Sequence, residues 1–434
     1  MLDIKFIREN AGKIKEAAKN KNISLDVGEI IKLDIKKRET QNQIDELRAQ
    51  RNELAQIGKQ GKPTGEQIER GKKIKIEIAE IEKKSDIIES DYKKLMYAIP
   101  NIFSEDTPIC PDESGNKILR KYGKIPKFDF KVKNHMELSE IHNLIDTEKS
   151  AVISGARFNY LFNEAVMIQF ALIQFVFQVL TDRKIIKKLA DKVSNPFDTP
   201  FTPVIPPVII KAEIMKKMDR FDPIEDRYYL KEDDSLFVGS AEHTMGPLHL
   251  NEILDEKDLP IRYIGYSTAF RREAGTYGKD TAGILRRHQF DKLEMESFIQ
   301  PKYGLVEQDL IIAIQEYLVQ QLEIPYQVVI KCTGDMGKQD FRAVDIECWM
   351  PGQNKYRETH TSDYMTDYQA RRLNTKYKTK DNKKELVHMN DATAFAIGRI
   401  LIVILENYQQ ADGSILIPKV LQKYMGGIKK IKKK

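Results

Sequence analysis

The segment 268–298 carries an aromatic ring, carboxylates and arginines at spacings that suit a bound nucleotide. It is typical of a strand, a long polar loop and a second strand. Side chains alternate between the faces of a strand, so Phe290 and Glu294 share a face about 13 Å apart, at ~3.4 Å per residue. A base stacked on Phe290 and an ammonium group held by Glu294 fit this separation, with Arg271 near a phosphate between them. An amphipathic hairpin with a salt-bridged, exposed face fits the segment equally well.

The sequence lacks several common motifs for nucleotide binding and hydrolysis. It has no G-x-x-x-x-G-K-[ST] phosphate loop, no G-x-G-x-x-G after a strand, no H-E-x-x-H and no G-x-S-x-G elbow. Cys110, Cys332 and Cys348 lie far apart without metal-ligand spacing, so we expect neither a disulfide framework nor a zinc site. A bound nucleotide must therefore be held by side chains.

Composition narrows the class of protein. The 434 residues suggest two or three domains at roughly 150 residues each. Lys and Arg (71) exceed Asp and Glu (65) by 6, and this mild excess permits a polyanionic partner without requiring one. The most apolar window, 166–180, contains three glutamines and is shorter than the about 20 residues of a membrane span. We expect a buried helix there, no membrane anchor, and a cytoplasmic location.

The elements before the nucleotide-like segment begin with two long helices. Apolar residues in a 3-4 spacing run from Ile30 to Leu54, and a second series runs from Ile74 to Leu95. The turn between them, 58–65, contains glycine and proline. The pattern predicts an antiparallel coiled-coil hairpin at 28–98. Each helix of about 30 residues would be about 45 Å long and would project into solvent.

Positive charge gathers around the predicted turn. Between residues 48 and 75 there are three anions and eight cations, which are Arg48, Arg51, Lys59, Lys62, Arg70, Lys72, Lys73 and Lys75. A solvated helical face is the commoner explanation of such a run. The alternative is a lever whose basic end binds nucleic-acid phosphates.

The remainder of the chain mixes helices and strands. A proline-containing linker at 101–135 precedes a helical stretch at 163–193, and the last strong helix is expected at 393–408. Strands are expected in four segments, 262–271, 286–298, 325–331 and 341–349. They are not in regular βαβ alternation, so the fold class is α+β, an antiparallel sheet flanked by helices.

Several motifs resemble those of the seryl-tRNA synthetases, a family of class II aminoacyl-tRNA synthetases. FRREAG at 270–275 and HQFDKLE at 288–294 resemble the second signature motif of that class. Similar segments in the same order are ISGARFNYL (153–161), CTGDMG (332–337), DIECWMPGQNKYRE (345–358), DYQARR (367–372) and ENYQQADGSILIPKVLQKYMGG (406–427). The resemblance covers nearly all of the chain, and chance agreement of so many ordered motifs is remote.

The resemblance implies a domain organisation and a reaction. An N-terminal helical tRNA-binding domain at 1–100 would be followed by the linker, a class II catalytic domain at 136–428 and a basic tail at 429–434. The enzyme would use ATP and Mg²⁺ to convert L-serine into seryl-adenylate and transfer it to the 3′ end of tRNA(Ser), and of tRNA(Sec) where the source has one. A homodimer is implied, with Pro207 in the first class II motif at its interface.

The resemblance also assigns roles to residues. Arg271 matches the arginine on the α-phosphate, Phe290 the ring on adenine, and Arg399 the third-motif arginine on the γ-phosphate. Arg272 and Glu273 occupy positions that contact ATP, and Glu358 with Thr361 the positions that hold Mg²⁺.

For serine, the matching residues are Ser240, Glu242, Arg271, Glu294 and Thr393. The segment MNDATAFA departs from the family pattern by what reads as one extra residue, so either Asn390 or Asp391 is the one that lines the serine pocket.

Two alternatives stay open at this stage. One is a synthetase-like paralogue that has lost amino-acid activation or delivers the amino acid elsewhere. The other is a non-enzymatic coiled-coil adaptor that binds nucleic acid.

Overall fold

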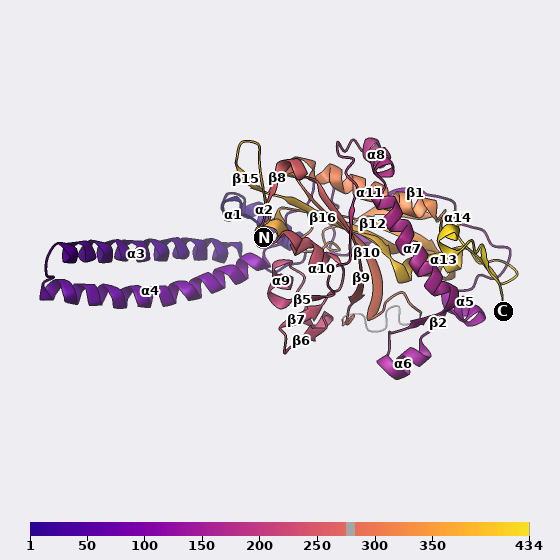
Figure 1. Cartoon of the computed structure of the whole chain (residues 1–434), viewed down its shortest axis with the longest axis horizontal. Helices are drawn as coiled ribbons and strands as arrows, with labels where there is room; N and C mark the ends of the chain where they lie inside the picture. Colours follow the sequence, from indigo (N-terminus) through magenta and orange to yellow (C-terminus); the bar gives the residue numbers. More distant parts are fainter. Residues whose placement is uncertain (275–282, 434) are drawn as a thin grey trace. The chain divides into compact units, whose positions relative to one another are not determined.

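The computed structural model describes residues 1–274 and 283–433, without the side chains of residues 59 and 60 (Figure 1). The chain divides into two compact units, Met1–Ile102 and Phe103–Lys434. Each unit is described by itself.

The first unit consists of helices. The short helices α1 (Ile4–Glu9) and α2 (Ala11–Asn20) precede two 34-residue helices, α3 (Val27–Gln60) and α4 (Gly65–Ala98). The Asp26 side chain caps the first turn of α3, and Thr64 with Gln67 forms a capping box at the start of α4. At about 1.5 Å per residue each long helix measures about 51 Å.

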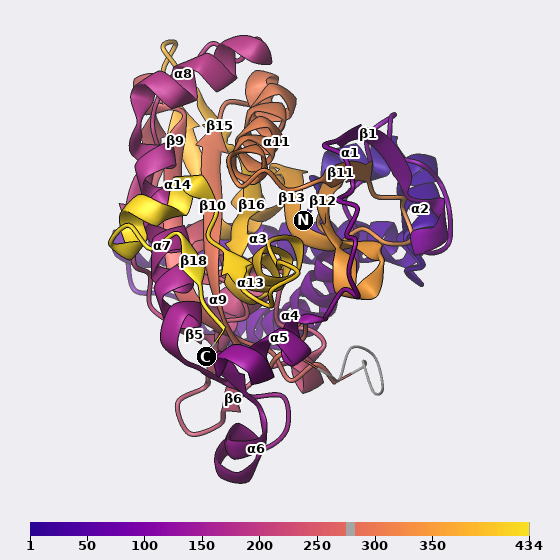
Figure 2. The ribbon, with the colours of Figure 1, turned by 90° about the vertical axis from the view of Figure 1, so that its right-hand side faces the viewer.

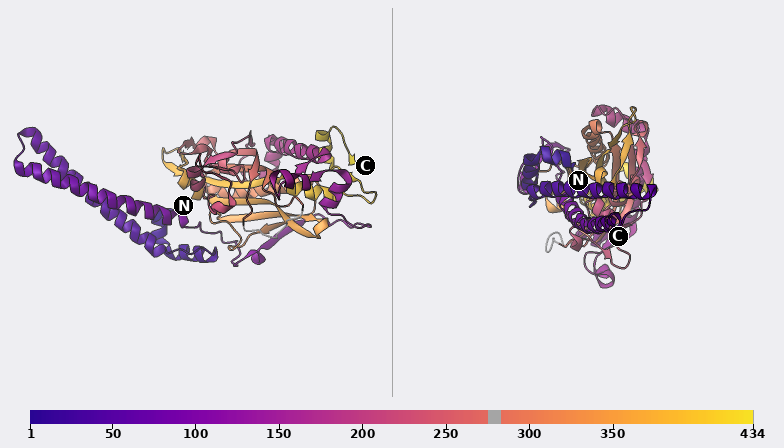
Figure 3. Two further views of the ribbon diagram at one scale, coloured as in Figure 1. Left: turned by 90° about the horizontal axis from the view of Figure 1, so that it is seen from below. Right: turned by 90° about the vertical axis from the view of Figure 1, so that its left-hand side faces the viewer.

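Helices α3 and α4 lie side by side as an antiparallel pair, which confirms the predicted hairpin (Figures 1 and 3). Five members of the two predicted series are buried in the pair, namely Ile30, Leu33, Ile44, Ile74 and Ile78. Charged pairs flank the apolar seam, as in coiled coils: Lys37 Nζ lies 2.6 Å from a Glu89 carboxylate oxygen and Arg48 Nη2 2.8 Å from one of Glu82.

The second unit is built on an eight-stranded sheet in the order β1-β11-β12-β13-β16-β10-β9-β4 (Figure 2). Only the β4–β9 pair is parallel within this sheet of the described residues. The strands are β1 (Lys117–Tyr122), β4 (Thr202–Val204), β9 (Ile261–Phe270), β10 (Gln289–Ile299), β11 (Tyr326–Ile330), β12 (Arg342–Met350), β13 (Lys355–Thr366) and β16 (His388–Ala396).

Helices cover one face of this sheet. The largest contribution comes from α7 (Asn163–Thr181), α11 (Gly304–Gln321) and α13 (Ile397–Asn407), whose apolar side chains share one core cluster with Leu293 and Met295 of β10. Because side chains alternate along a strand, Phe290 and Glu294 point to the other face. Smaller helices complete the unit, namely α5 (His135–His142), α6 (Glu148–Ser154), α8 (Arg183–Lys192), α9 (Ala212–Lys217), α10 (Glu242–Met245), α12 (Tyr368–Leu373) and α14 (Lys419–Gln422).

Helix α7 contains the apolar window noted in the sequence. By length and composition alone it is sufficient to cross a membrane, and half of its most apolar stretch is buried inside the protein. Ile168, Leu172, Phe175 and Val176 belong to the main core cluster, as predicted for a buried helix. Core helices of soluble proteins can be equally long and apolar.

Some predicted elements differ from the structure. The expected helix at 393–408 is wrong in its first four residues, because 388–396 form β16 and only α13 is helical. A short run such as Thr-Ala-Phe-Ala fits a strand or a helix equally well, and its pairing with β10 makes it a strand. Strand β13 was not predicted. The stretch expected to be a linker, 101–135, supplies β1, which pairs with β11 at the edge of the sheet.

Candidate active site

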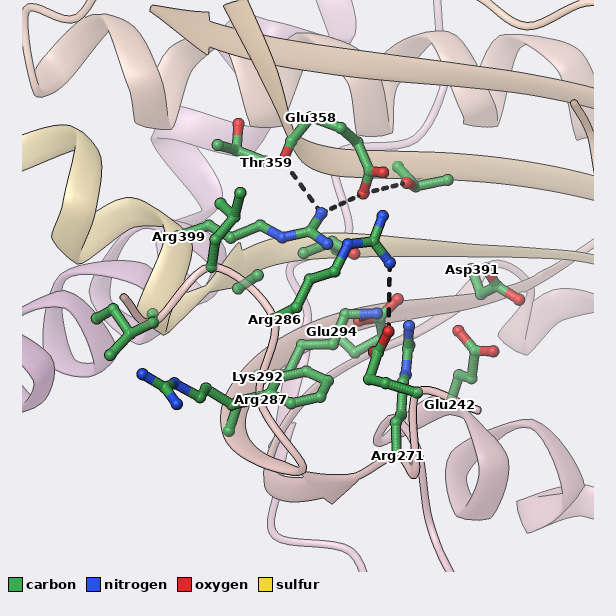
Figure 4. A pocket seen from close by; sticks show the side chains of 18 of the residues that line it. Glu242, Arg271, Arg286, Arg287, Lys292, Glu294, Glu358, Thr359, Asp391 and Arg399 are labelled. Atoms are coloured by element: carbon green, nitrogen blue, oxygen red, sulfur yellow. Dashed lines mark hydrogen bonds and ion pairs between the residues drawn. The ribbon is translucent and has the colours of Figure 1, made fainter. Parts of the chain in front are cut away.

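A polar cavity of about 260 Å³ opens on the face of the sheet opposite α7, α11 and α13 (Figure 4). Its walls come from the ends of β9 and β10, from β13 and β16, and from the first turn of α13. Arg271, Phe290 and Glu294 all line it. The three side chains that the sequence suggested for a nucleotide, a phosphate and an ammonium group therefore meet in one place.

Arg271 is held firmly at the mouth of the β9–β10 hairpin. Its backbone N–H donates to the His288 carbonyl at 2.9 Å, and its Nε donates to the Gly239 carbonyl at 3.1 Å. The guanidinium carbon lies 5.4 Å from the centre of the Phe290 ring, within cation–π range. The remaining guanidinium nitrogens face the cavity in Figure 4, where a phosphate could accept from them.

One end of the cavity is rich in buried carboxylates. Oxygen atoms of Glu242, Glu294 and Asp391 lie within 4.8 Å of one another, so repulsion among them must be offset. Arg220 Nη2 lies 2.9 Å from Glu242 Oε1 and 3.0 Å from Asp391 Oδ2. Lys292 Nζ lies 2.6 Å from Glu294 Oε2. Each carboxylate thus has a cationic partner from the protein itself.

Two members of this group, Lys292 and Arg220, were not assigned a role from the sequence, and Asp391 was one of two candidates. Lys292 also donates to Ser240 Oγ at 3.2 Å, and its position two residues before Glu294 on the same face was the available signal. Arg220 comes from the loop after α9, with no local signal of its role. Asp391 lines the cavity, whereas Asn390 donates to the Gly304 carbonyl at 3.3 Å on the other face of β16. Of the two residues left open in the sequence, Asp391 is the one that lines this cavity.

Charge and burial give these carboxylates different acidities. Burial raises the pKa of Glu294 to about 7, although the Lys292 ammonium opposes the rise. Burial would also raise the pKa of Glu242, but Arg220 and Lys292 outweigh it and lower the pKa to about 2. Burial, followed by the negative charge of Glu242, raises the pKa of Asp391. Glu242 is therefore ionised at neutral pH, while Glu294 titrates near it.

The other end of the cavity contains an arginine–carboxylate pair. Arg399 Nη1 lies 2.6 Å from Glu358 Oε1 and 3.1 Å from the Glu358 carbonyl oxygen, and Thr361 Oγ1 lies 3.5 Å from the same carboxylate oxygen (Figure 4). Burial alone would raise the pKa of Glu358. The positive charges of Arg399 and Lys331 outweigh it and lower the pKa to about 2. The side chain is still 44% exposed because the cleft is open above it. An ionised carboxylate and a hydroxyl are ligands that a hard divalent cation accepts.

The two remaining nucleotide candidates are placed differently. Glu273 lines the cavity, and its carboxylate lies 3.2 Å from Arg286 Nη1. Arg272 instead donates to the Arg227 carbonyl at 2.9 Å and lies over the Tyr228 ring, 4.8 Å from its centre. Thr393 lines the carboxylate-rich end of the cavity, and the buried Ser240 accepts a hydrogen bond from Lys292.

The basic residues of the coiled coil lie on its surface. The exposed members of the predicted set are Arg48, Arg51, Lys62, Arg70, Lys72, Lys73 and Lys75. Two of them have acidic neighbours, since Arg48 pairs with Glu82 and Lys72 with Glu69 at 2.8 Å. The side chain of Lys59 lies outside the described residues.

The fold and the site together define a class of protein. An antiparallel sheet with an arginine- and carboxylate-lined cleft on its open face is the core of a class II aminoacyl-tRNA synthetase, and the model of the tRNA synthetase class II core domain (G, H, P, S and T) matches residues 224–408. The model of the seryl-tRNA synthetase N-terminal domain matches residues 1–103.

Comparison with known proteins identifies the family. The serine–tRNA ligase of Nitrosopumilus maritimus is 39% identical over 99% of this chain and 100% of the relative, and that of Dictyoglomus turgidum is 40% identical over 98% of each. Among solved structures, seryl-tRNA synthetase from Pyrococcus horikoshii complexed with ATP superposes with a TM-score of 0.88 at 37% identity, covering all of both chains. The cytoplasmic serine–tRNA ligase from Naegleria fowleri in complex with AMP gives 0.84 at 30% identity, covering 100% of this chain and 99% of that one. The chain belongs to the seryl-tRNA synthetase family, and its activity is the ligation of serine to tRNA.

Proposed function

We propose that the described cavity activates L-serine with ATP and that the basic coiled coil binds the tRNA that receives it. The observation that carries this proposal is the meeting of Arg271, Phe290 and Glu294 in one cavity. The two structural relatives were solved with ATP and with AMP, which supports a nucleotide at this place. The test is ATP–pyrophosphate exchange with a panel of amino acids. Exchange that depends on serine supports the proposal, and exchange with another amino acid or with none refutes it.

The first step needs alignment and charge neutralisation from the protein. The serine carboxylate attacks the α-phosphorus, a new P–O bond forms, and pyrophosphate leaves with the electrons of the broken bond. The carboxylate is already a nucleophile, so the protein needs no general base. Phe290 would stack on adenine, while Arg271 at the α-phosphate and Arg399 at the γ-phosphate would offset the developing negative charge. In the second step a terminal ribose hydroxyl of the tRNA attacks the adenylate carbonyl and AMP leaves.

Serine recognition would use the carboxylate-rich end. One of Glu242 and Glu294 would pair with the α-ammonium group and the other would accept from the side-chain hydroxyl, with Ser240 and Thr393 beside them. Alanine would leave a buried acceptor without a partner, which costs affinity. Threonine must be excluded by the shape of the pocket, a difference of only about 1–3 kcal/mol per methyl group.

Magnesium is the metal that fits the other end. Glu358 and Thr361 offer a carboxylate and a hydroxyl, and Asp345, which pairs with Thr361 in the β12–β13 register, adds a second carboxylate at the same place. Mg²⁺ bound there would be held by a few protein ligands together with phosphate oxygens of the substrate, and it would neutralise part of the phosphate charge. Arg399 would have to share Glu358 with the ion.

The coiled coil of α3 and α4, here called the arm, supplies the contacts with tRNA. Its exposed cations would bind the backbone of tRNA(Ser), and of tRNA(Sec) where one exists, because phosphates attract lysine and arginine. Deleting 28–98 should leave serine-dependent exchange intact and weaken the charging of tRNA. Equal loss of both activities would contradict an independent tRNA-binding arm.

A homodimer in the cytoplasm completes the proposal. The segment around Pro207 exposes apolar side chains, with Ile205 82% and Ile209 46% exposed. Such residues favour burial against a partner surface, and the resemblance to the first class II motif points to a second copy of this chain.

The two alternatives are disfavoured. A non-enzymatic adaptor would not need a cavity with this arrangement, and a paralogue without activation would not need both charged ends. Full-length similarity to serine–tRNA ligases weighs against both. The adaptor and a paralogue without activation predict no serine-dependent exchange, whereas a paralogue that delivers the amino acid elsewhere predicts exchange without charging of tRNA.

A further inference from the structure

A buried histidine–glutamate pair lies behind the nucleotide end of the cavity. His135, the first residue of α5, is 6% exposed, and Glu406, near the end of α13, is fully buried. Glu406 Oε1 accepts from the His135 backbone N–H and lies 3.0 Å from His135 Nδ1, and its other oxygen accepts from the Gly352 N–H at 2.9 Å. The carboxylate is thus held by three groups from two other segments.

These contacts determine the state of the imidazole ring. A carboxylate can only accept, so Nδ1 carries the proton, and Nε2 is left as an acceptor. The Ile284 backbone N–H donates to Nε2 at 3.3 Å. The backbone at Gly283, with φ +75°, packs directly on the ring, since a Cβ there would lie 2.0 Å from Nε2.

The pair connects three segments that form the nucleotide end. Residues 284–287 line the cavity directly after the contact with His135. Helix α13 holds Arg399 at its first turn and Glu406 near its end. The turn at Gly352 leads into β13, which supplies Glu358, and it is packed so closely that a Cβ on Gly352 would lie 2.9 Å from the Glu406 carboxylate carbon. The serine end has no such contact with the pair among the described residues.

We propose that the Glu406–His135–Ile284 hydrogen-bond chain is a positioning device for ATP binding, which fixes the 284–287 wall relative to Arg399 and Glu358. His135 does not touch the substrate in this arrangement. It acts through the backbone at Ile284, whose N–H it accepts, and through Glu406, which it orients. Loss of the chain should therefore weaken ATP binding and leave serine binding largely unchanged.

Two substitutions of His135 distinguish the hydrogen bond made by Nδ1 from the one made by Nε2. In His135→Asn the amide can still donate to Glu406 but cannot reach Ile284, whereas in His135→Gln the amide oxygen can accept near the place of Nε2. We expect His135→Asn to raise KM for ATP about tenfold in serine-dependent exchange, the size expected for one lost hydrogen bond, and KM for serine to change by less than about twofold. His135→Gln should recover most of the ATP affinity.

His142→Asn is the matched control. His142 is also buried, on the same helix, and its Nε2 lies 2.8 Å from the Gly413 carbonyl oxygen, away from the cavity. It should lower thermal stability to a similar degree as His135→Asn without a selective change in KM for ATP. An equal rise in both KM values for His135→Asn, an unchanged KM for ATP, or the same selective effect in His142→Asn would overturn the inference.

A measurement on the unaltered enzyme does not depend on the variants folding. Hydrogen exchange resolved at Ile284 should show an amide protected well beyond an exposed loop amide, and exchange at the free-chain rate would refute the hydrogen bond to His135. The kinetic readout rests on the proposed function, and the two failures are distinguishable. Absence of serine-dependent exchange in the unaltered enzyme refutes the proposed function, whereas normal exchange with an unaffected His135→Asn refutes only this inference.

Discussion

At the scale of single residues, the two adjacent arginines after β9 make a sharp comparison. Arg271 lines the cavity beside Phe290, whereas Arg272 lies over Tyr228 and donates to a backbone carbonyl. We predict that Arg271→Ala lowers serine-dependent pyrophosphate exchange by orders of magnitude, because the charge that develops on the α-phosphate loses its partner. Arg272→Ala is the control and should lose much less. A near-normal rate for Arg271→Ala would contradict the site.

The carboxyl group of Glu294 makes serine binding sensitive to pH. Its pKa of about 7 means that it is mostly protonated below neutrality and ionised above it, whereas Glu242, with a pKa near 2, stays ionised throughout. KM for serine should therefore fall as pH rises from about 6 to about 8, where the serine ammonium group keeps its charge. The pH profile of Glu294→Gln should be flatter. A flat profile in the unaltered enzyme would contradict the role of Glu294.

The same pKa has a consequence for stability. The folded pKa of Glu294 lies above the value of 4.5 for an unperturbed glutamate, so the folded chain holds a proton that the unfolded chain has lost. The contribution of Glu294 to the free energy of unfolding should therefore decline as pH rises between about 4.5 and 7. Urea unfolding of the unaltered enzyme and of Glu294→Gln across this range measures the difference. The glutamine variant should lack this part of the decline.

Residue-level prediction succeeded where the signal is local. Phe290 and Glu294 lie on one strand and are separated by two repeats of its two-residue period, so alternation alone predicted that they share a face. Lys292 lies on that face too, but alternation does not say that it pairs with Glu294. Arg220 pairs with Asp391, which lies 171 residues further along the chain, and this contact depends on how β16 pairs with β10. No single-strand pattern contains that information.

At the scale of elements, the seam between α3 and α4 gives a direct test. Ile78 is 5% exposed in the seam, whereas Ile76, two residues earlier, is 61% exposed. Ile78→Asn should destabilise the hairpin by about 2–4 kcal/mol, since it removes apolar contacts and buries an amide. The expected result is a lower melting temperature of the isolated 1–102 fragment and weaker tRNA charging by the full chain. Ile76→Asn should change neither by a comparable amount.

The elements that sequence analysis identified are those with a strong period. Both arm helices follow a 3-4 spacing over many turns, and their turn contains glycine and proline, so their ends were predicted within a few residues. Strand β13 has no clean alternation, because Glu358, Thr359 and His360 follow one another as site and core residues. Strand β1 is exposed at the edge of the sheet, so it lacks an apolar face that would reveal it. Both strands depend on neighbours distant in the sequence.

At the scale of the whole molecule, the assembly can be tested at one exposed side chain. Ile205→Asp places a charge where the proposed dimer would bury an isoleucine, so the variant should be monomeric at concentrations where the unaltered chain is dimeric. Light scattering after size-exclusion chromatography measures the mass. Ile109→Asp is the control, because Ile109 is 62% exposed in the segment before β1 and should leave the mass unchanged. A monomeric unaltered chain would refute the homodimer.

The ion pairs at the serine end have a further consequence for the two substrates. Lys292 and Arg220 already neutralise the carboxylates before any amino acid arrives. The ammonium group of serine would take over carboxylate contacts that these two cations already make, and zwitterionic serine adds no net charge to the enzyme. Its binding should therefore respond weakly to ionic strength. The polyanionic substrate of the arm releases bound salt ions instead, and its binding should weaken steeply as salt is added. One salt titration would separate the two modes of recognition in a single enzyme.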